Sequence, residues 1–141
     1  MSKNIKVVLD TNVWISGLVF GGKPEAILKL FIDGQIIVII SEEIMTELRR
    51  IIIDKFPLFK PRLSLLEASI RNDTILVQLG DQRIAVSRDS DDNKIIETAV
   101  TGKVNYIITG DDDLLILKIF GNIDIIKPAA FLDIYKQDKR L

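Results

Sequence analysis

Short runs of apolar residues recur along this chain, and segments with a helical pattern separate most of them. Val7, Val8 and Leu9 are three consecutive apolar residues, two of them β-branched, as expected for a strand buried on both faces. Similar runs predict four more strands, at residues 36–40, 74–79, 106–109 and 123–126. Strands that alternate with helices indicate a parallel sheet, because parallel strands need long crossover connections.

The segments between the strands carry helix start and stop signals. Pro24 suits the first turn of a helix that Gly34 can close. Ser41 can cap the next helix, whose apolar residues recur every three to four positions. The predicted helices cover residues 24–34, 42–53, 91–102 (beginning at Asp91 or Asp92) and 112–120, with two more after Pro61 and Pro128. Residues 80–91 are predicted to form a polar loop, with a small strand near residues 84–86.

Length and composition indicate one folded domain. The chain has 141 residues, enough to bury about 70% of the surface that its unfolded state exposes. Apolar residues make up 48% of the chain and charged residues 28%, a balance typical of globular rather than disordered proteins. No repeat or linker interrupts this composition, so the predicted domain spans residues 1–141.

Two residue types are missing, and their absence narrows the chemistry. The chain contains neither cysteine nor histidine. Disulfides, thiolate catalysis, histidine general bases and zinc sites built on cysteine or histidine are therefore excluded. Any catalysis must rely on carboxylates, lysine, hydroxyl groups and bound metal.

Charge and hydropathy patterns bear on partners and location. The net charge of −1 creates no global field for nucleic acid, so binding a polyanion requires local basic patches or bound cations. No segment approaches the roughly 20 uninterrupted apolar residues of a membrane span. The first residues also lack the apolar centre of a signal peptide. We therefore expect a cytoplasmic protein without a membrane partner.

Four acidic residues occupy positions where predicted strands end or on the helices that connect them. Asp10 directly follows the first strand, and Asp111 follows the fourth. Glu47 lies on the helix after the second strand, and Asp92 begins the helix before the fourth. The carboxyl ends of parallel strands meet at one edge, where open α/β sheets bind their ligands. Several carboxylates at that edge favour a hard divalent cation.

Each acid on its own also has a structural explanation. Asp92 can cap a helix, and Glu47 can pair with Arg50 one turn further on. Acids at residues 111–113 can complement the dipole of the helix that they begin. Asp10 is harder to explain in this way, because a carboxylate at the end of a buried strand needs a partner. The combination of acids, rather than any single one, supports the hypothesis of a metal site.

Four stretches of the chain resemble the motifs of PIN-domain ribonucleases. Residues 8–16 (VLDTNVWIS) are similar to the opening motif of that family. Residues 41–48 (SEEIMTEL), 88–99 (RDSDDNKIIETA) and 108–115 (ITGDDDLL) resemble the second, third and fourth motifs. The resemblance covers nearly the whole chain in the correct order. It points to the bacterial and archaeal branch of toxin–antitoxin toxins related to VapC.

The resemblance implies a three-layer α/β/α fold with a five-stranded parallel sheet in the order 3-2-1-4-5. In that order the chain changes direction between strands 1 and 4, so a crevice is expected between Asp10 and residues 109–111. Glu47 and Asp92 would approach this crevice from the flanking helices.

The resemblance also implies a site for Mg²⁺ or Mn²⁺ that hydrolyses RNA phosphodiester bonds. The expected catalytic and metal-binding residues are Asp10, Glu47, Asp92 and Asp111, with Asp113 as a further metal ligand or as the fourth acid in place of Asp111. Asn12 and Thr109 would orient these acids through hydrogen bonds. The motifs are compatible with one ion or with two.

Contacts to substrate and partners are less specified by the sequence. Arg88 and Lys94 flank Asp92 and are the expected phosphate-binding residues for RNA. Trp14 follows a buried strand, which favours a place in the core or an interface over stacking on a base. The family implies a homodimer and, for its toxins, a small antitoxin protein that occupies the groove.

Two alternatives remain open at this point. A phospho-signalling receiver domain is also an acid-bearing α/β protein, and Lys127, Pro128 and Thr109 match parts of its pattern. A receiver, however, needs paired acids after its first strand and an acceptor aspartate after its third, where Asp81 is the nearest acid. The other alternative is a PIN domain without catalytic activity that serves only as a binding module.

Overall fold

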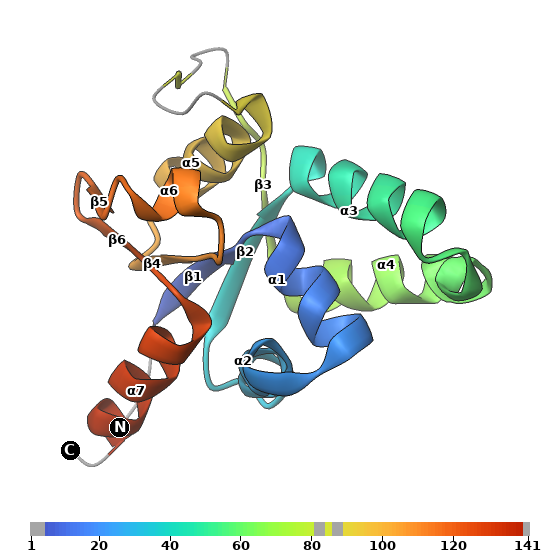
Figure 1. The fold of residues 1–141 in the computed structure, drawn as a ribbon, viewed down its shortest axis with the longest axis horizontal. Coiled ribbons are helices and arrows are strands. Elements are labelled where there is room, and N and C mark those ends of the chain that lie inside the picture. The colour runs from blue at the N-terminus through green and yellow to red at the C-terminus, as the bar shows by residue number, and fades with distance from the viewer. Residues whose placement is uncertain (1–4, 81–83, 86–88, 140–141) are drawn as a thin grey trace.

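The sheet of this protein brings the amino-terminal strand to its centre. The structure is a computed structural model that describes residues 5–80, 84–85 and 89–139. In these residues the strands are β1 (Lys6–Leu9), β2 (Ile37–Ser41), β3 (Ile75–Val77), β4 (Tyr106–Ile108), β5 (Ile119–Phe120) and β6 (Ile123–Ile126). They form one sheet in the order β3-β2-β1-β4-β6-β5. The strand β1 therefore lies between β2 and β4 (Figure 1).

The predicted five-stranded sheet is confirmed in its order and corrected in its composition. The five predicted strands are β3, β2, β1, β4 and β6, and every neighbouring pair among them is parallel. A sixth strand, β5, pairs antiparallel with β6 and makes the sheet mixed. The predicted helix over residues 112–120 is wrong in its second half, because β5 and β6 form a hairpin around Gly121, whose φ is +61°. A two-residue Gly-Asn connection is a known hairpin signal.

Helices cover both faces of this sheet in three layers. The helical elements are α1 (Thr11–Ile15), the π-helical η1 (Ser16–Phe20), α2 (Gly22–Ile32), α3 (Glu42–Lys55), the 3₁₀ turn η2 (Pro57–Arg62), α4 (Leu63–Asp73), α5 (Ser90–Gly102), α6 (Asp112–Leu115) and α7 (Pro128–Lys139). The helix α5 packs against β1, β2, β3 and β4, whereas α2 and α7 pack against each other. Right-handed crossovers place α5 on the face opposite α2 and α3, because the chain returns from β3 to β4 in the reverse direction.

The core lies where the sequence pattern placed it. Val7, Val8 and Leu9 are fully buried, as are Ile107 and Ile108 on the neighbouring strand. Trp14 is also buried, at 2% exposure, and its ring packs edge-to-face on Phe31 with 5.9 Å between centroids. Trp14 is therefore a core residue and not a base-stacking platform. None of the helices in the described residues is long and apolar enough to cross a membrane.

Helix caps decide how the acids of the site are presented. Ser41 caps α3 as predicted, because its hydroxyl accepts a hydrogen bond from the Ile44 amide at 3.4 Å. The start of α5 differs from the prediction. Asp89 is its cap and accepts a hydrogen bond from the Asp91 amide at 2.9 Å, so α5 begins at Ser90. Asp92 lies in the first turn instead of at the cap, and its side chain is buried.

Candidate metal centre

Asp10 lies at the junction of β1 and α1 and is held on both carboxylate oxygens. Its Oδ2 accepts a hydrogen bond of 2.6 Å from the Thr109 hydroxyl, and its Oδ1 accepts one of 3.2 Å from the backbone amide of Asn12. The pairing of Leu9 with Ile108 brings Asp10 and Thr109 together, although they are 99 residues apart in sequence. Only 6% of Asp10 is exposed, and this burial raises its pKa, while the hydrogen bond from Thr109 acts in the opposite direction.

Glu47 reaches the same region from α3. The Thr11 hydroxyl donates a hydrogen bond to Glu47 Oε1, and Arg50 lies 3.8 Å from Oε2, the ion pair expected from the sequence. The pKa of Glu47 is raised to about 7, chiefly by burial, and the neighbouring carboxylate of Asp91 contributes through a hydrogen bond and through charge. Glu47 therefore faces other acids across the pocket as well as pairing with Arg50.

Three further carboxylates converge from α5 and from the end of β4. Oxygen atoms of Asp89, Asp92 and Asp111 all lie within 4.8 Å of one another. Asp92 is only 4% exposed, and burial raises its pKa to about 7. The neighbouring Asp111 contributes to this rise through a hydrogen bond and through repulsion between the two negative charges. A divalent cation bound between these oxygens would offset the repulsion that raises the pKa of Asp92.

The geometry distinguishes Asp111 from Asp113, which the sequence left open. Asp111 caps α6 and lines the pocket with its carboxylate. Its Oδ1 also accepts a hydrogen bond of 2.9 Å from the Asp113 amide. Asp113 lies in the first turn of α6 and is not among the described residues that line the pocket.

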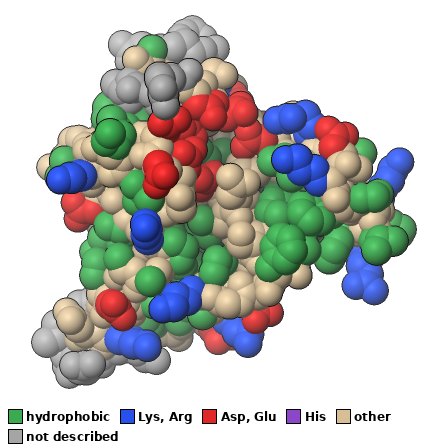
Figure 2. Space-filling view, in the orientation of Figure 1, with side chains coloured by type: hydrophobic (Ala, Val, Ile, Leu, Met, Phe, Trp, Pro, Cys, Tyr) green, Lys and Arg blue, Asp and Glu red, His purple; other side chains and the backbone are tan. Residues whose placement is uncertain are grey.

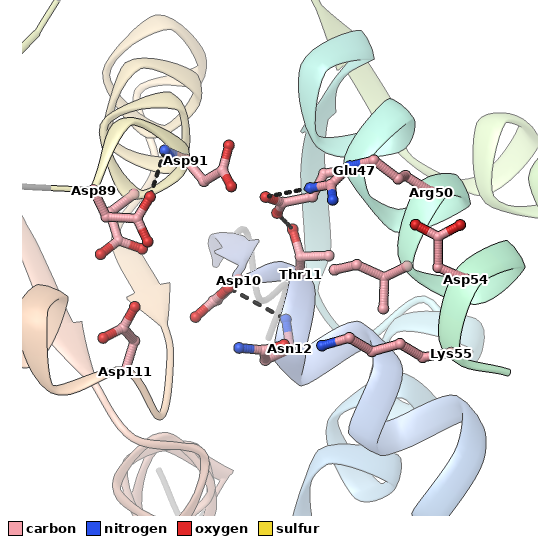
Figure 3. Close-up of a pocket in the computed structure, with 12 residues that line it drawn as sticks. Asp10, Thr11, Asn12, Glu47, Arg50, Asp54, Lys55, Asp89, Asp91 and Asp111 are labelled. Carbon is pink, nitrogen blue, oxygen red and sulfur yellow. Dashed lines mark hydrogen bonds and ion pairs between the residues drawn. The ribbon is translucent and has the colours of Figure 1, made fainter.

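These side chains line a cavity of about 230 Å³ at the carboxyl ends of β1 and β4 (Figure 3). In the space-filling view, acidic side chains gather between α5 and α3 (Figure 2). The described residues that line the cavity are Asp10, Thr11, Asn12, Glu47, Arg50, Ile51, Asp54, Lys55, Asp89, Asp91, Asp92 and Asp111. The predicted acids Asp10, Glu47, Asp92 and Asp111 are all among them, and Thr109 supports Asp10 from below the surface.

Of the two predicted phosphate-binding residues, only Lys94 lies in the part of the chain that the structure describes, and it is not among the described residues that line this cavity. The Lys94 ammonium lies 3.3 Å from a carboxylate oxygen of Glu97, which is one turn further on α5 and buried. The same Glu97 carboxylate accepts a hydrogen bond of 2.8 Å from the Ile84 amide. Lys94 thus belongs to a structural network, and Arg88 lies outside the described residues. Ile84 and Ala85 form no strand, and Val86 of the predicted small strand is likewise not described.

Asp89, Ile51 and Asp54 line the cavity although the sequence pattern did not predict them as site residues. Asp89 falls in the predicted loop, but an acid just before a helix is also a cap signal. Arg50, Ile51, Asp54 and Lys55 follow Glu47 at intervals of three, four, seven and eight residues, which are the intervals of one helix face. That spacing was a usable signal once Glu47 had been identified.

The residues present fit a hard divalent cation. Mg²⁺ and Mn²⁺ bind carboxylate oxygens, and Mg²⁺ usually takes one or two carboxylates and keeps several water ligands. Asp89, Asp92 and Asp111 offer three such oxygens within a few ångströms, and Asp10 lies beside them with both oxygens positioned by hydrogen bonds. The raised pKa values of Asp10 and Asp92 indicate that it costs free energy to ionise these carboxyl groups in the folded protein. A bound cation would offset that cost.

Fold and site together define a class of protein. It is a three-layer α/β/α domain whose mixed sheet carries a carboxylate pocket at the point where strand order reverses. Residues 6–113 match the family described as PIN domain, and the chain belongs to this family. This membership confirms the resemblance found in the sequence and shows that the receiver-domain alternative is wrong.

The chain is also similar to proteins from other organisms. An uncharacterized protein, MJ1680, of Methanocaldococcus jannaschii is 35% identical over 124 residues, covering 81% of this chain and 76% of the relative. Among solved structures, VapBC2 from Rickettsia felis bound to a DNA fragment from its promoter contains a similar chain, with a TM-score of 0.61 and 13% identity. FitAcB from Neisseria gonorrhoeae gives a TM-score of 0.53 and 16% identity. Each comparison covers 87% of this chain and 98% of the other, and at these identities it shows the fold alone.

Proposed function

We propose that this chain is a metal-dependent ribonuclease that hydrolyses phosphodiester bonds in RNA with Mg²⁺ or Mn²⁺. The observation that carries the proposal is the convergence of Asp10, Asp92 and Asp111, from three separate elements, on one pocket. Membership of the PIN family supports nuclease activity in general. The choice of RNA as substrate and of these two ions comes from the sequence motifs.

The chain would contribute ligands and their orientation. Asp89, Asp92 and Asp111 would hold the cation, together with Asp10 directly or through water. A bound divalent cation supplies an acidified water and neutralises charge on the phosphate. Thr109 and the Asn12 amide fix the Asp10 carboxylate, and Thr11 fixes Glu47 toward the pocket. Hydrolysis then adds a water oxygen to phosphorus and breaks the bond to one ribose oxygen, which takes up a proton.

Cleavage of a mixed RNA pool tests this proposal. With Mn²⁺ the wild-type protein should shorten the RNA, and Asp10→Asn should reduce the rate by a factor of about 100 or more, because ligand geometry at the cation is lost. Asp33→Asn, an exposed change at the end of α2, is the matched control and should leave the rate unchanged. Equal cleavage by wild type and Asp10→Asn would contradict the proposal. No cleavage by any form would instead favour a PIN domain that only binds.

We also propose that the protein is the toxin of a toxin–antitoxin pair and that it forms a homodimer in the cytoplasm. The support is the shared fold with chains of the VapBC2 and FitAcB assemblies, together with the motif resemblance. Growth arrest on expression of wild type but not of Asp10→Asn would support the toxin role. Light scattering of the purified protein would give its oligomeric state.

A further inference from the structure

The pocket extends beyond its carboxylates along one face of α3. Glu47 lies at one end of this face and Lys55 at the other, with Arg50, Ile51 and Asp54 between them. With a rise of 1.5 Å per residue, the backbone of Lys55 lies about 12 Å along the helix axis from that of Glu47. Side chains on a helix point back toward its amino terminus, which directs the Lys55 ammonium toward the carboxylates. Figure 3 shows this ammonium pointing toward Asn12.

The cations of the pocket lie on this face of α3. Among the described lining residues, seven are acids, and the only cations are Arg50 and Lys55. The Arg50 side chain is 60% exposed, and its ion pair with Glu47 is loose at 3.8 Å. Lys55 forms no ion pair within residues 5–80, 84–85 and 89–139. Both side chains can therefore contact a ligand without first breaking a strong interaction.

We infer that Arg50 and Lys55 form a subsite for the phosphate adjacent to the one that is cleaved. This inference rests on the proposed ribonuclease function. A phosphate at the carboxylates is repelled by them unless a divalent cation is bound, whereas the next phosphate along the strand meets fixed positive charge. The Arg50 guanidinium can donate two parallel hydrogen bonds to phosphate oxygens, and the Lys55 ammonium adds a second charge.

The subsite sets a minimum length for the RNA. The strand must carry at least two phosphates, so that one reaches the acids and the other reaches the basic side chains of α3. An RNA longer than a dinucleotide is therefore the preferred substrate.

Binding of a labelled RNA tests the subsite separately from catalysis. The probe is a fluorescein-labelled, single-stranded octanucleotide, titrated by anisotropy with Ca²⁺ in place of Mg²⁺ and checked for integrity on a gel. Arg50→Gln and Lys55→Gln should each weaken binding about threefold to tenfold, and each should reduce the salt slope of log K by about 0.7. Lys60→Gln, five residues beyond Lys55 and outside the pocket, is the matched control and should bind like wild type.

A cleavage assay with Mn²⁺ provides the second readout. The two variants should raise KM for the octanucleotide with little change in kcat, and they should match wild type on a dinucleotide, which has a single phosphodiester. If wild type cleaves RNA while Arg50→Gln and Lys55→Gln keep its affinity, salt slope and KM, the subsite is wrong and the ribonuclease proposal stands. If wild type neither binds nor cleaves RNA, the ribonuclease proposal is wrong and the subsite falls with it.

Discussion

The Thr109 hydroxyl connects two of the acids on which the site depends. It donates a hydrogen bond to Asp10 and accepts one of 2.9 Å from the Asp111 amide. Thr109 is fully buried, so no water is available to replace either interaction. A single hydroxyl thus orients the carboxylate that follows β1 and the backbone that follows β4. The orientation of ligating carboxylates by such partners commonly sets metal affinity.

Replacement of Thr109 should therefore weaken metal binding. Thr109→Val keeps the shape of the side chain but removes the donor to Asp10, so Mn²⁺ affinity should fall about 10-fold to 100-fold. The pKa of Asp10 should rise further, because the hydrogen bond from Thr109 lowers it. Isothermal titration calorimetry with Mn²⁺ measures the affinity, and Thr109→Ser, which keeps the hydroxyl, is the control. Equal affinities for the two variants would contradict this role.

The acids after β4 should also differ in their effect on metal binding. Asp111 belongs to the carboxylate cluster, whereas Asp113 does not line the pocket. Asp111→Asn preserves the helix cap and removes the charge, so Mn²⁺ affinity should drop by at least tenfold. Asp113→Asn should stay within about twofold of wild type. A larger loss for Asp113→Asn in the same calorimetric titration would reverse the assignment.

At the scale of elements, α5 serves both the site and the chain that precedes it. Its first turn presents Asp92 to the pocket, and the Lys94–Glu97 pair begins two residues later. The buried Glu97 carboxylate accepts the hydrogen bond of the Ile84 amide, which ties Ile84 to this helix. A partly buried amide that loses its acceptor costs free energy wherever water does not replace that acceptor.

Removal of the Glu97 acceptor should destabilise the fold. Glu97→Ala leaves the Ile84 amide without this partner, and the free energy of unfolding should fall by about 1–3 kcal/mol. Glu97→Gln keeps an oxygen that can accept the same hydrogen bond and should lose less. Urea unfolding followed by circular dichroism measures both variants. A loss for Glu97→Gln as large as that for Glu97→Ala would show that the charge, through Lys94, is the important feature.

At the scale of the whole molecule, the fold buries acidic side chains together, and without metal their ionisation costs free energy. The pKa of Glu47 rises from 4.5 to about 7 and that of Asp92 from 3.8 to about 7. Between about pH 4 and pH 7 the folded state therefore binds more protons than the unfolded state, and the free energy of unfolding falls as pH rises. The stability that these two protonated carboxyl groups contribute is fully present below about pH 4 and is lost as the pH rises through about 7.

Stability should therefore depend on pH and metal together. Without divalent ions, the free energy of unfolding should be higher at pH 5.5 than at pH 8, and Mg²⁺ or Mn²⁺ should raise it mainly at pH 8, where the carboxylates are charged. Urea unfolding at pH 5.5 and at pH 8, with and without the ion, measures these free energies. Asp92→Asn should flatten the pH profile and reduce the effect of metal. A metal-free profile that rises between pH 5.5 and 8 would contradict the prediction.

Sequence patterns predicted the central strands of the sheet better than its edge strand and the start of α5. β1, β2, β4 and β6 begin and end within one residue of their predicted positions, because buried parallel strands are nearly continuous apolar runs. β5 was missed because two residues are too short for a pattern. The start of α5 was misplaced because Asp89, Asp91 and Asp92 are all acceptable caps, and only the backbone geometry selects among them.

The sequence by itself determined the elements of this protein and the kinds of side chain available to its site. Apolar periodicity and turn residues act over a few positions, so they can be recognised locally. Only the tertiary structure decided that Asp10 meets Thr109, that Asp111 rather than Asp113 faces the pocket, and that Lys94 is held by Glu97 while Arg50 and Lys55 line the cavity. These contacts depend on strand order and on the direction of each side chain around its helix, which distant parts of the chain set together.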